Sequence, residues 1–383
     1  ANKHKYKYFF VLFCLFLTYI VLGDDMKKFL ILLLLFFPLT TKAFETSAKA
    51  GILMDMDSHR ILYSKNIHYT QSVASISKIM TGILAVESGK MDEIVTIGKE
   101  IYQAHGSGIY IKEGEKLTLR DLVYGLMLRS GNDAALAIAT FVSGSKEKFV
   151  QLMNEKAKEI GMLETTFHNP HGLDDEEEGN ISSAYDMAIL TSYASQNKEY
   201  LKIVGTKKYT LKTNKNTYVW HNKNKLLTMY PYATGGKTGY TKKAKRTLVT
   251  TASYKNLNLV AVTINDGNDF NDHKQLFEEA YENYQSYSIL EKGNFPVYSD
   301  TYYTDYRFKI KNKFSAAFTK EERKNLYLKI DLLKKRKIKE GEKIGTVSVM
   351  LDDKIFHKEN IYIYEKEKEK KSFFSKIKDF FYD

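Results

Sequence analysis

Apolar positions recur along the first third of the chain with two periods, which separate predicted strands from predicted helices. Residues 51–54 and 61–63 are short apolar runs on either side of a polar turn, a pattern typical of two strands. Over residues 76–89 the apolar positions follow the helical period and end at a glycine, which predicts a helix. The same period predicts two further helices, at residues 118–128 and 134–142.

After the paired glycines at 235 and 236, apolar residues again recur at every second position, as in a strand. Strands are predicted at residues 237–241, 246–252 and 259–265, and a helix at residues 273–284. Strands therefore stand at both ends of this part of the chain, with helices between them. The pattern predicts an α/β (α+β) fold in which helices pack on one sheet.

The hydrophobic pattern changes again near residue 290, where short alternating segments predict a small all-β domain. Its strands are expected at residues 302–310, 326–330, 345–351 and 355–363. The chain is accordingly divided into four parts: a hydrophobic N-terminus (1–43), a first domain (44–288), a small β-rich domain (289–364), and a charged linker with an amphipathic helix (365–383).

Two apolar runs lie in the N-terminal segment. The second follows Met26 and two lysines, spans residues 29–39 and ends at a small-residue cleavage site, which is the layout of a secretory signal peptide. Translation is therefore expected to start at Met26, with an uncleaved double hydrophobic anchor as the alternative. Cys14, the one cysteine of the chain, lies in this segment. A mature chain without cysteine excludes a disulfide framework, a cysteine-ligated zinc site and a cysteine nucleophile.

The charge of the chain narrows the possible partners. The formal net charge is +12, and 27% of residues are charged. Lysines are mixed with glutamates along the chain without an arginine-rich patch, so no nucleic-acid partner is expected.

Apolar residues near the C-terminus follow a helical spacing. This spacing suits a helix lying in a membrane interface, with a helix docked on the β-rich domain as the alternative. The apolar residues are Phe373, Phe374, Ile377, Phe380 and Phe381.

Three short motifs carry the candidate chemistry: Ser75-Ile76-Ser77-Lys78, Ser130-Gly131-Asn132 and Lys237-Thr238-Gly239. Each is weak alone. The Ser-x-x-Lys spacing, for example, also occurs at Ser143, Ser145 and Ser375.

The position of each motif within the predicted helices and strands separates the occurrences that could form a site from those that occur by chance. Ser75 opens an apolar helix, so Lys78 lies one turn away on the same face. A lysine kept neutral by burial and nearby cations could take the serine proton. Ser130 and Asn132 fall in a break between two helices, where their side chains can converge on a cleft. Lys237 opens a strand after two glycines, which lets a substrate backbone approach closely.

Longer segments around these motifs resemble the serine D-Ala-D-Ala carboxypeptidases, the low-molecular-mass penicillin-binding proteins. The likeness covers about residues 50–286, and the β-rich tail is similar to the family's second domain more loosely. The resemblance implies a β-lactamase/DD-peptidase-like domain with an antiparallel sheet and helices. The segments that carry it are residues 122–135, 169–174, 184–188 and 237–241.

The resemblance implies a role for each motif residue. Ser75 would be the nucleophile, Lys78 the general base, and Ser130 a proton relay to the departing D-Ala. Backbone N–H groups of Ser75 and Tyr240 would form the oxyanion hole. Substrate binding is implied for five residues: Asn132, Lys237, Thr238, Gly239 and Tyr240. Asp272 and His273 occupy the region where some members carry an arginine for the substrate carboxylate.

The partners implied by the resemblance are the stem peptide of peptidoglycan and β-lactam antibiotics. The membrane surface would be a further partner, through the C-terminal helix. An exported enzyme on the outer face of the bacterial cytoplasmic membrane is expected, without a cofactor. An acidic run at residues 174–178 is interpreted as a solvated loop, so no metal is expected. His171 and His273 are interpreted as structural histidines, with a general base or a carboxylate-binding group as the alternative.

Three other functions are weighed against this one. A class A β-lactamase would have Ser-Asp-Asn as its second motif, but here Gly131 stands in the middle, and no Glu-x-x-Leu-Asn string is present. A transpeptidase is disfavoured because no long glycosyltransferase or pedestal domain is present. A non-catalytic wall-binding protein on the same fold is disfavoured by the complete motifs.

Overall fold

The computed structural model describes residues 44–174, 179–297, 301–303 and 306–365. The segments expected to form a signal peptide and a C-terminal amphipathic helix, and most of the acidic run, therefore lie outside the described residues. Within the described part of the chain, no helix is both long and apolar enough to cross a membrane.

A five-stranded antiparallel sheet forms the first domain's centre, with the strand order β2-β1-β11-β10-β9. Its strands come from both ends of the domain's sequence, as the hydrophobic pattern predicts. They are β1 (Ala50–Asp55), β2 (Ile61–Lys65), β9 (Ala233–Thr241), β10 (Lys245–Tyr254) and β11 (Leu257–Ile264).

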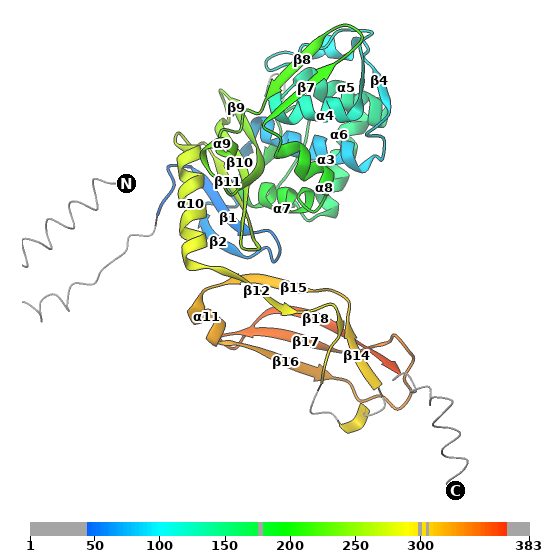
Figure 1. The fold of residues 1–383 in the computed structure, drawn as a ribbon, viewed down its shortest axis with the longest axis vertical. Helices are drawn as coiled ribbons and strands as arrows, with labels where there is room; N and C mark the ends of the chain where they lie inside the picture. Colours follow the sequence, from blue (N-terminus) through cyan, green and yellow to red (C-terminus); the bar gives the residue numbers. More distant parts are fainter. Residues whose placement is uncertain (1–43, 175–178, 298–300, 304–305, 366–383) are drawn as a thin grey trace, which may run out of the picture. The chain divides into compact units, whose positions relative to one another are not determined.

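Helices occupy the sequence between these strands (Figure 1). Ser75 lies in a short 3-10 turn, η1 (Ala74–Ser77), which leads directly into α3. The α-helices are α3 (Lys78–Glu87), α4 (Leu119–Tyr124), α5 (Asn132–Ser143), α6 (Lys146–Glu159), α7 (Ala184–Ala194), α8 (Lys198–Val204), α9 (Leu226–Met229) and α10 (Asp269–Asn283). Smaller elements are the 3-10 turn η2 (Lys99–Gln103), the π-helix η3 (Gly125–Arg129) and the short strands β3 (Gln71–Ser72), β4 (Ile94–Thr96), β5 (Lys116–Thr118) and β6 (Ile181–Ser182).

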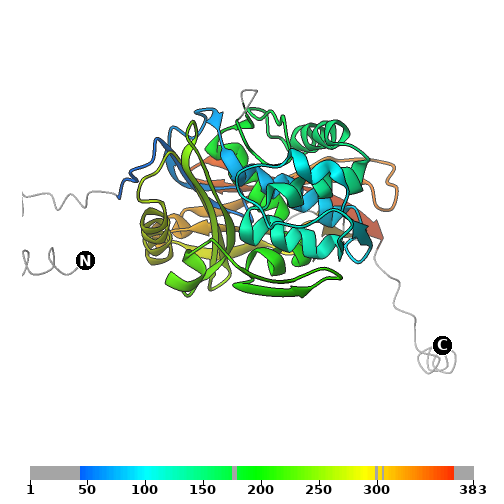
Figure 2. The ribbon, with the colours of Figure 1, turned by 90° about the horizontal axis from the view of Figure 1, so that it is seen from above.

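The two faces of the sheet are covered by different helices, because side chains alternate along each strand. Val260 and Val262 of β11 belong to the main hydrophobic core, which also contains residues of α3, α4, α5 and α7. Thr263, on the other face, contacts His273 of α10. Figure 2 shows α10 on one side of the sheet and the helices of the main hydrophobic core on the opposite side.

A hairpin of β7 (Lys208–Lys212) and β8 (Thr217–His221) is absent from the sequence expectations. Tyr209 of β7 stacks with Tyr124 of α4 on one side and with Trp220 of β8 on the other. The residues that follow β8 run along the rim of the cleft described below.

Most strands of the small all-β domain fall where the sequence predicts them. A five-stranded antiparallel sheet has the order β13-β14-β18-β17-β16, and β12 pairs with β15. The boundary expected between residues 288 and 289 falls within β12, whose Leu290 belongs to this domain's own core. The elements are β12 (Gln285–Leu290), β13 (Gly293–Asn294), η4 (Thr301–Tyr303), β14 (Tyr306–Ile310), β15 (Phe314–Phe318), α11 (Lys320–Lys324), β16 (Leu326–Leu332), β17 (Lys343–Leu351) and β18 (Lys354–Glu365).

Candidate active site

The Ser75 hydroxyl and the Lys78 amine lie at hydrogen-bond distance, at the junction of η1 and α3. The Nζ atom of Lys78 is 3.0 Å from Oγ of Ser75. The spacing of three residues produces this contact because it spans about one helical turn. Ser75 is half-buried, whereas Lys78 is completely buried.

Two further oxygen atoms surround the Lys78 amine. Its Nζ donates to Oδ1 of Asn132 at 2.7 Å and to the backbone carbonyl of His171. Asn132 is in turn fixed by its Nδ2 group, which donates to the His105 carbonyl at 2.5 Å. The amine is therefore held in place whether it is charged or neutral.

Two buried lysines lie at this site without a carboxylate partner. Burial lowers the pKa of Lys78 well below its usual range, and the charges of Lys237 and Lys223 lower it further. Burial, together with the charge of Lys223, lowers the pKa of Lys237 to about 7. A lysine that is neutral near physiological pH can act as a general base.

Ser130 is presented by a break between two helices, as the sequence predicts. The π-helix η3 ends at Ser130, whose backbone is left-handed with φ 66° and ψ 37°. Helix α5 then begins at Asn132, and the Asn132 amide donates to the Ser107 carbonyl at 2.7 Å. The break thus places Asn132 on the Lys78 amine and Ser130 on the wall of the cleft.

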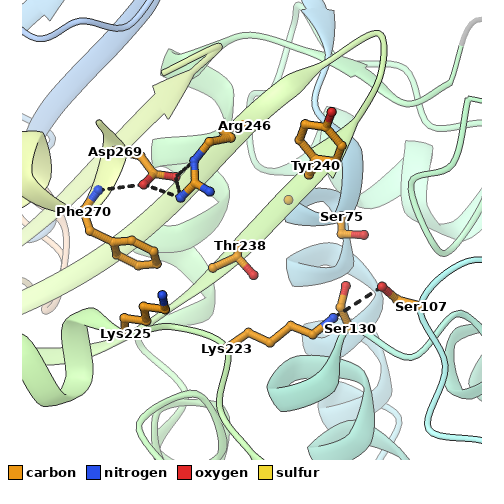
Figure 3. A pocket seen from close by; sticks show the side chains of 11 residues that line it. Ser75, Ser107, Ser130, Lys223, Lys225, Thr238, Tyr240, Arg246, Asp269 and Phe270 are labelled. Atoms are coloured by element: carbon orange, nitrogen blue, oxygen red, sulfur yellow. Dashed lines mark hydrogen bonds and ion pairs between the residues drawn. The ribbon is translucent and has the colours of Figure 1, made fainter. Parts of the chain in front are cut away.

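The strand β9 approaches the Ser75 turn closely because Gly239 has no side chain. A Cβ atom at Gly239 would lie 2.4 Å from Oγ1 of Thr247 and 3.0 Å from the backbone nitrogen of Ser75. Neighbouring Lys237 is buried, and its Nζ donates to the Thr238 carbonyl at 2.7 Å. Thr238 and Tyr240 line the cleft (Figure 3).

The cleft between these elements has a volume of about 330 Å³. It contains Ser75, Ser130, Thr238, Gly239 and Tyr240 of the predicted site, whereas Lys78, Asn132 and Lys237 lie behind its wall. Six lining residues were not predicted: Ser107, Lys223, Lys225, Arg246, Asp269 and Phe270. A usable signal existed for Arg246 alone, because a hairpin between the strands predicted at 237–241 and 246–252 places it opposite Tyr240.

Ser77, Ser145, His171 and His273 make hydrogen bonds within the protein. The Ser77 hydroxyl donates to the Ala74 carbonyl at 2.9 Å, and Ser145 caps α6. The His171 ring accepts from the Leu173 amide, and burial with the charge of Lys78 lowers its pKa to about 3. His273 is buried between Thr250 and Thr263, and burial lowers its pKa to about 3. Both rings are therefore neutral in the folded protein.

No group of three or more His, Cys, Asp or Glu side chains able to hold a metal ion occurs among the residues that the structure describes.

A serine paired with a buried lysine, with a second serine and a lysine-bearing strand across the same cleft, defines a class of enzyme. The class is the serine acyl transferases that use lysine as their base.

Comparison with known proteins identifies the family within this class. Residues 38–268 match the family model described as D-alanyl-D-alanine carboxypeptidase. Residues 284–369 match the model of the penicillin-binding protein 5 C-terminal domain. The chain belongs to the D-alanyl-D-alanine carboxypeptidase family of penicillin-binding proteins, as a serine-type enzyme. Its fold is accordingly a DD-peptidase domain followed by the family's all-β C-terminal domain.

Individual relatives agree with this assignment. The chain is 36% identical to the D-alanyl-D-alanine carboxypeptidase DacF of Bacillus subtilis, over 64% of this chain and 65% of that one. It is 28% identical to DacC of Escherichia coli, over 89% of both chains. Among solved structures, penicillin-binding protein 5 from Haemophilus influenzae superimposes with a TM-score of 0.73 at 28% identity. That match covers 85% of this chain and 98% of the other.

Proposed function

We propose that Ser75 removes the terminal D-Ala from peptidoglycan stem peptides through an acyl-enzyme intermediate. The observation that carries the proposal is the contact between the Ser75 hydroxyl and a buried lysine amine whose pKa is lowered. A neutral amine has two N–H groups, which Asn132 and the His171 carbonyl can accept. Its lone pair then points at the Ser75 hydroxyl and can take the proton.

In the first step Ser75 Oγ attacks the carbonyl carbon of the D-Ala-D-Ala peptide bond while its proton passes to Lys78. The negative charge that develops on the carbonyl oxygen is stabilised by the backbone N–H groups of Ser75 and Tyr240. Such a donor contributes about 3–4 kcal/mol in well-formed oxyanion holes. Asn132 and Thr238 hold the peptide, with Gly239 allowing the close approach of β9.

In the second step the C–N bond breaks, and the leaving nitrogen takes a proton that Ser130 relays from Lys78. D-Ala then departs, and Lys78 is neutral again. Lys78 can now take a proton from a water molecule, which attacks the ester carbonyl. The C–O bond to Ser75 then breaks, Lys78 returns its proton to Ser75 Oγ, and the shortened peptide leaves. The charge of Lys237 favours an anionic substrate and helps to keep Lys78 neutral. A β-lactam acylates the same serine, and its ester hydrolyses slowly.

The test is release of D-alanine from a synthetic N-acyl-L-Lys-D-Ala-D-Ala peptide. We expect turnover by the wild type and none by Ser75→Ala. Ser77→Ala is the matched control, because that hydroxyl bonds the Ala74 carbonyl and lies outside the cleft. Turnover by Ser75→Ala at the wild-type rate would exclude Ser75 as the nucleophile. Rapid hydrolysis of benzylpenicillin without D-alanine release would favour a β-lactamase instead.

We also propose that the enzyme works on the outer face of the cytoplasmic membrane and binds that membrane through residues 373–381. The support is the sequence pattern alone, with apolar residues on one helical face and lysines on the other. Full-length protein should sediment with anionic phospholipid vesicles, and Phe374→Ser with Phe380→Ser should weaken sedimentation. Sedimentation of the double variant to the same extent as the wild type would contradict this location of the membrane contact.

A further inference from the structure

The loop between β16 and β17 contains the longest run of consecutive basic residues in the chain, Lys334-Lys335-Arg336-Lys337. Residues 334–343 hold six basic and two acidic side chains, which gives this segment a formal net charge of +4. We call residues 333–339 the basic loop. So much charge of one sign on a short surface loop attracts anions.

Two tyrosines of η4 hold the backbone of the basic loop. The hydroxyl of Tyr303, a side chain that is only 2% exposed, donates to the Leu333 carbonyl and accepts from the Lys335 amide at 3.0 Å. The Tyr302 hydroxyl donates to the Lys335 carbonyl at 3.1 Å. These bonds fix the first part of the loop, so its charges keep a defined place on the surface of the β-rich domain.

The charges at the tip of the basic loop are available to a partner. Lys335 forms an ion pair with Glu342. Arg336 and Lys337, by contrast, are exposed and form no ion pair with the described residues. A guanidinium and an ammonium group in this position can both bind the oxygen atoms of a phosphate.

The basic charges have apolar and aromatic neighbours. Leu333 is 58% exposed at the start of the loop, and Tyr302 is 47% exposed. The Nζ atom of Lys334 lies 5.9 Å from the centre of the Tyr302 ring. Basic residues combined with an exposed aliphatic side chain and a tyrosine are typical of a surface that lies at the headgroup level of a membrane.

The basic loop lies at the end of the β-rich domain from which the chain continues to its C-terminus. The strands β16 and β18 both run antiparallel to β17, so both end at the same end of the sheet (Figure 1). β16 ends at Leu332, where the loop begins, and β18 ends at Glu365. Two backbone bonds join the segments there. The Gly341 amide donates to the Ile363 carbonyl at 2.8 Å, and the Ile363 amide donates to the Glu342 carbonyl at 3.0 Å.

The segment proposed to bind the membrane begins close to this point in the sequence. Phe373 follows Glu365 by eight residues, a stretch that spans at most about 29 Å when fully extended. A membrane bound by residues 373–381 is therefore within this distance of the end of β18. A short tether of this kind raises the effective concentration of the membrane at the basic loop.

We propose that the basic loop binds the anionic phospholipid headgroups of the membrane, as a second contact beside residues 373–381. The proposal rests on the membrane location proposed above and adds a contact in the described part of the chain. Arg336 and Lys337 supply the charge, and Leu333 supplies an apolar contact. One weak membrane signal gives only reversible binding, whereas two signals together give stable association.

The experiment measures binding of the full chain to vesicles by sedimentation over a range of lipid concentrations. One set of vesicles contains phosphatidylglycerol and phosphatidylcholine in equal parts, and the other contains phosphatidylcholine alone. The double variant Arg336→Gln with Lys337→Gln should bind the anionic vesicles about 25-fold more weakly, because each basic residue at an anionic surface contributes about 5-fold to binding. Its binding to the neutral vesicles should not change, and high salt should remove the difference on the anionic ones.

The matched control is the double variant Lys208→Gln with Lys212→Gln. It removes the same number of charges from exposed positions on β7 of the first domain. The control should bind both kinds of vesicle as the wild type does. Both double variants should keep the wild-type melting temperature and the wild-type rate of D-alanine release from a soluble peptide, because neither pair of residues lines the cleft.

The variant Phe374→Ser with Phe380→Ser separates the two membrane contacts. If it weakens binding and the loop variant binds as the wild type does, the basic loop is overturned and the C-terminal contact is kept. If only the loop variant weakens binding, the basic loop is kept and the C-terminal contact is overturned. Failure of the wild type to bind either kind of vesicle would overturn both.

Two other results would overturn the proposal for the basic loop. An equal loss of binding by the loop variant on anionic and neutral vesicles would show that the headgroup charge is not what the loop recognises. Unchanged binding to vesicles together with lost binding to an isolated anionic wall polymer would assign the loop to that polymer instead.

Discussion

Lys78 is the residue on which the proposed chemistry depends. It is completely buried and bonded to three oxygen atoms, and two other lysines lower its pKa. An ammonium group in this position has no carboxylate bonded to it. The site therefore favours the neutral amine, which the proposed mechanism uses as its base in place of a histidine.

The first prediction concerns the ionisation of Lys78. The proposed mechanism requires the neutral amine, so kcat/KM should fall as the pH drops below the lowered pKa of Lys78. Lys78→Arg keeps the positive charge and cannot lose it, and should slow acylation by about 100-fold or more at every pH. Stopped-flow acylation by a chromogenic β-lactam measures both effects.

A matched control is Lys156→Arg. That lysine lies 2.9 Å from Glu159 on α6 and has no contact with the cleft. The β-lactam should acylate the Lys156→Arg variant at the wild-type rate and with the same pH profile. Acylation of Lys78→Arg at a rate near that of the wild type would show that the serine proton goes elsewhere.

The motif residues could be predicted from the sequence, whereas the groups that hold them could not. Ser75 and Lys78 are brought together by local helical geometry, which depends only on their spacing. The carbonyl groups of His105 and His171 fix Asn132 and Lys78, but they are backbone atoms of loops. Backbone carbonyls carry no residue-type signature, so the sequence pattern could not indicate them.

The turn from η1 into α3 is supported by a loop that contains Gly172. This glycine has φ +84°, and a Cβ atom on it would lie 2.2 Å from the Ala74 carbonyl oxygen. The neighbouring His171 carbonyl accepts from Lys78. The loop therefore sets the distance between the turn that carries Ser75 and the amine of Lys78, and only glycine allows so close an approach.

The second prediction follows from this approach. Gly172→Ala should lower the free energy of unfolding by about 2–4 kcal/mol, through positive-φ strain and the clash with Ala74, and should slow acylation by Ser75 as well. Gly161→Ala is the control, since Gly161 has φ +85° and nothing within 4 Å of its Cβ position. Gly161→Ala should lower the free energy of unfolding by about 1 kcal/mol and leave the rate of acylation unchanged. Denaturant unfolding measures the stability of each variant, and β-lactam acylation measures the reactivity of Ser75. An equal loss of stability in the two variants would contradict the clash with Ala74.

At the same scale, strand prediction succeeded for the continuously buried strands of the central sheet and failed for the hairpin of β7 and β8, whose burial alternates. The strands β9, β10 and β11 contain buried runs whose bounds were found to within a few residues. The hairpin of β7 and β8 was missed because its turn, residues 213–216, contains no glycine. That omission also hid Lys223 and Lys225, which follow the hairpin and reach the cleft.

The stability of the whole molecule depends on buried groups that are neutral in the folded state. His273 is completely buried between the sheet and α10, and its pKa is lowered to about 3 by burial. In the unfolded chain a histidine titrates near pH 6.5. Between these two values the unfolded state binds the additional proton, so the free energy of unfolding falls as the pH falls.

The third prediction tests this linkage. Lowering the pH from 7 to 5 should reduce the free energy of unfolding by about 2 kcal/mol through His273 alone. The variant His273→Gln should abolish that part of the reduction. Each variant is compared with its own stability at pH 7, by urea unfolding, so that changes in packing cancel. His221→Gln, an exposed position on β8, should keep the wild-type dependence on pH. A His273→Gln variant that loses as much stability as the wild type would contradict the assignment.

The division into domains was partly visible in the sequence. The change to short strands near residue 290 predicted the all-β domain, because a change of period reflects a change of architecture. Strand β12 begins five residues earlier, at Gln285, and pairs with β15. This pairing joins segments about 30 residues apart, and local periodicity does not reveal such partners.

The most direct test of the central claim is the intact mass of the protein over time after mixing with benzylpenicillin, with Ser75→Ala alongside. The account predicts a persistent adduct of one drug molecule on the wild type, located on the peptide that contains Ser75, and none on Ser75→Ala. An adduct of equal occupancy on Ser75→Ala, or none on a folded wild type, would contradict the claim that Ser75 is the acylated nucleophile.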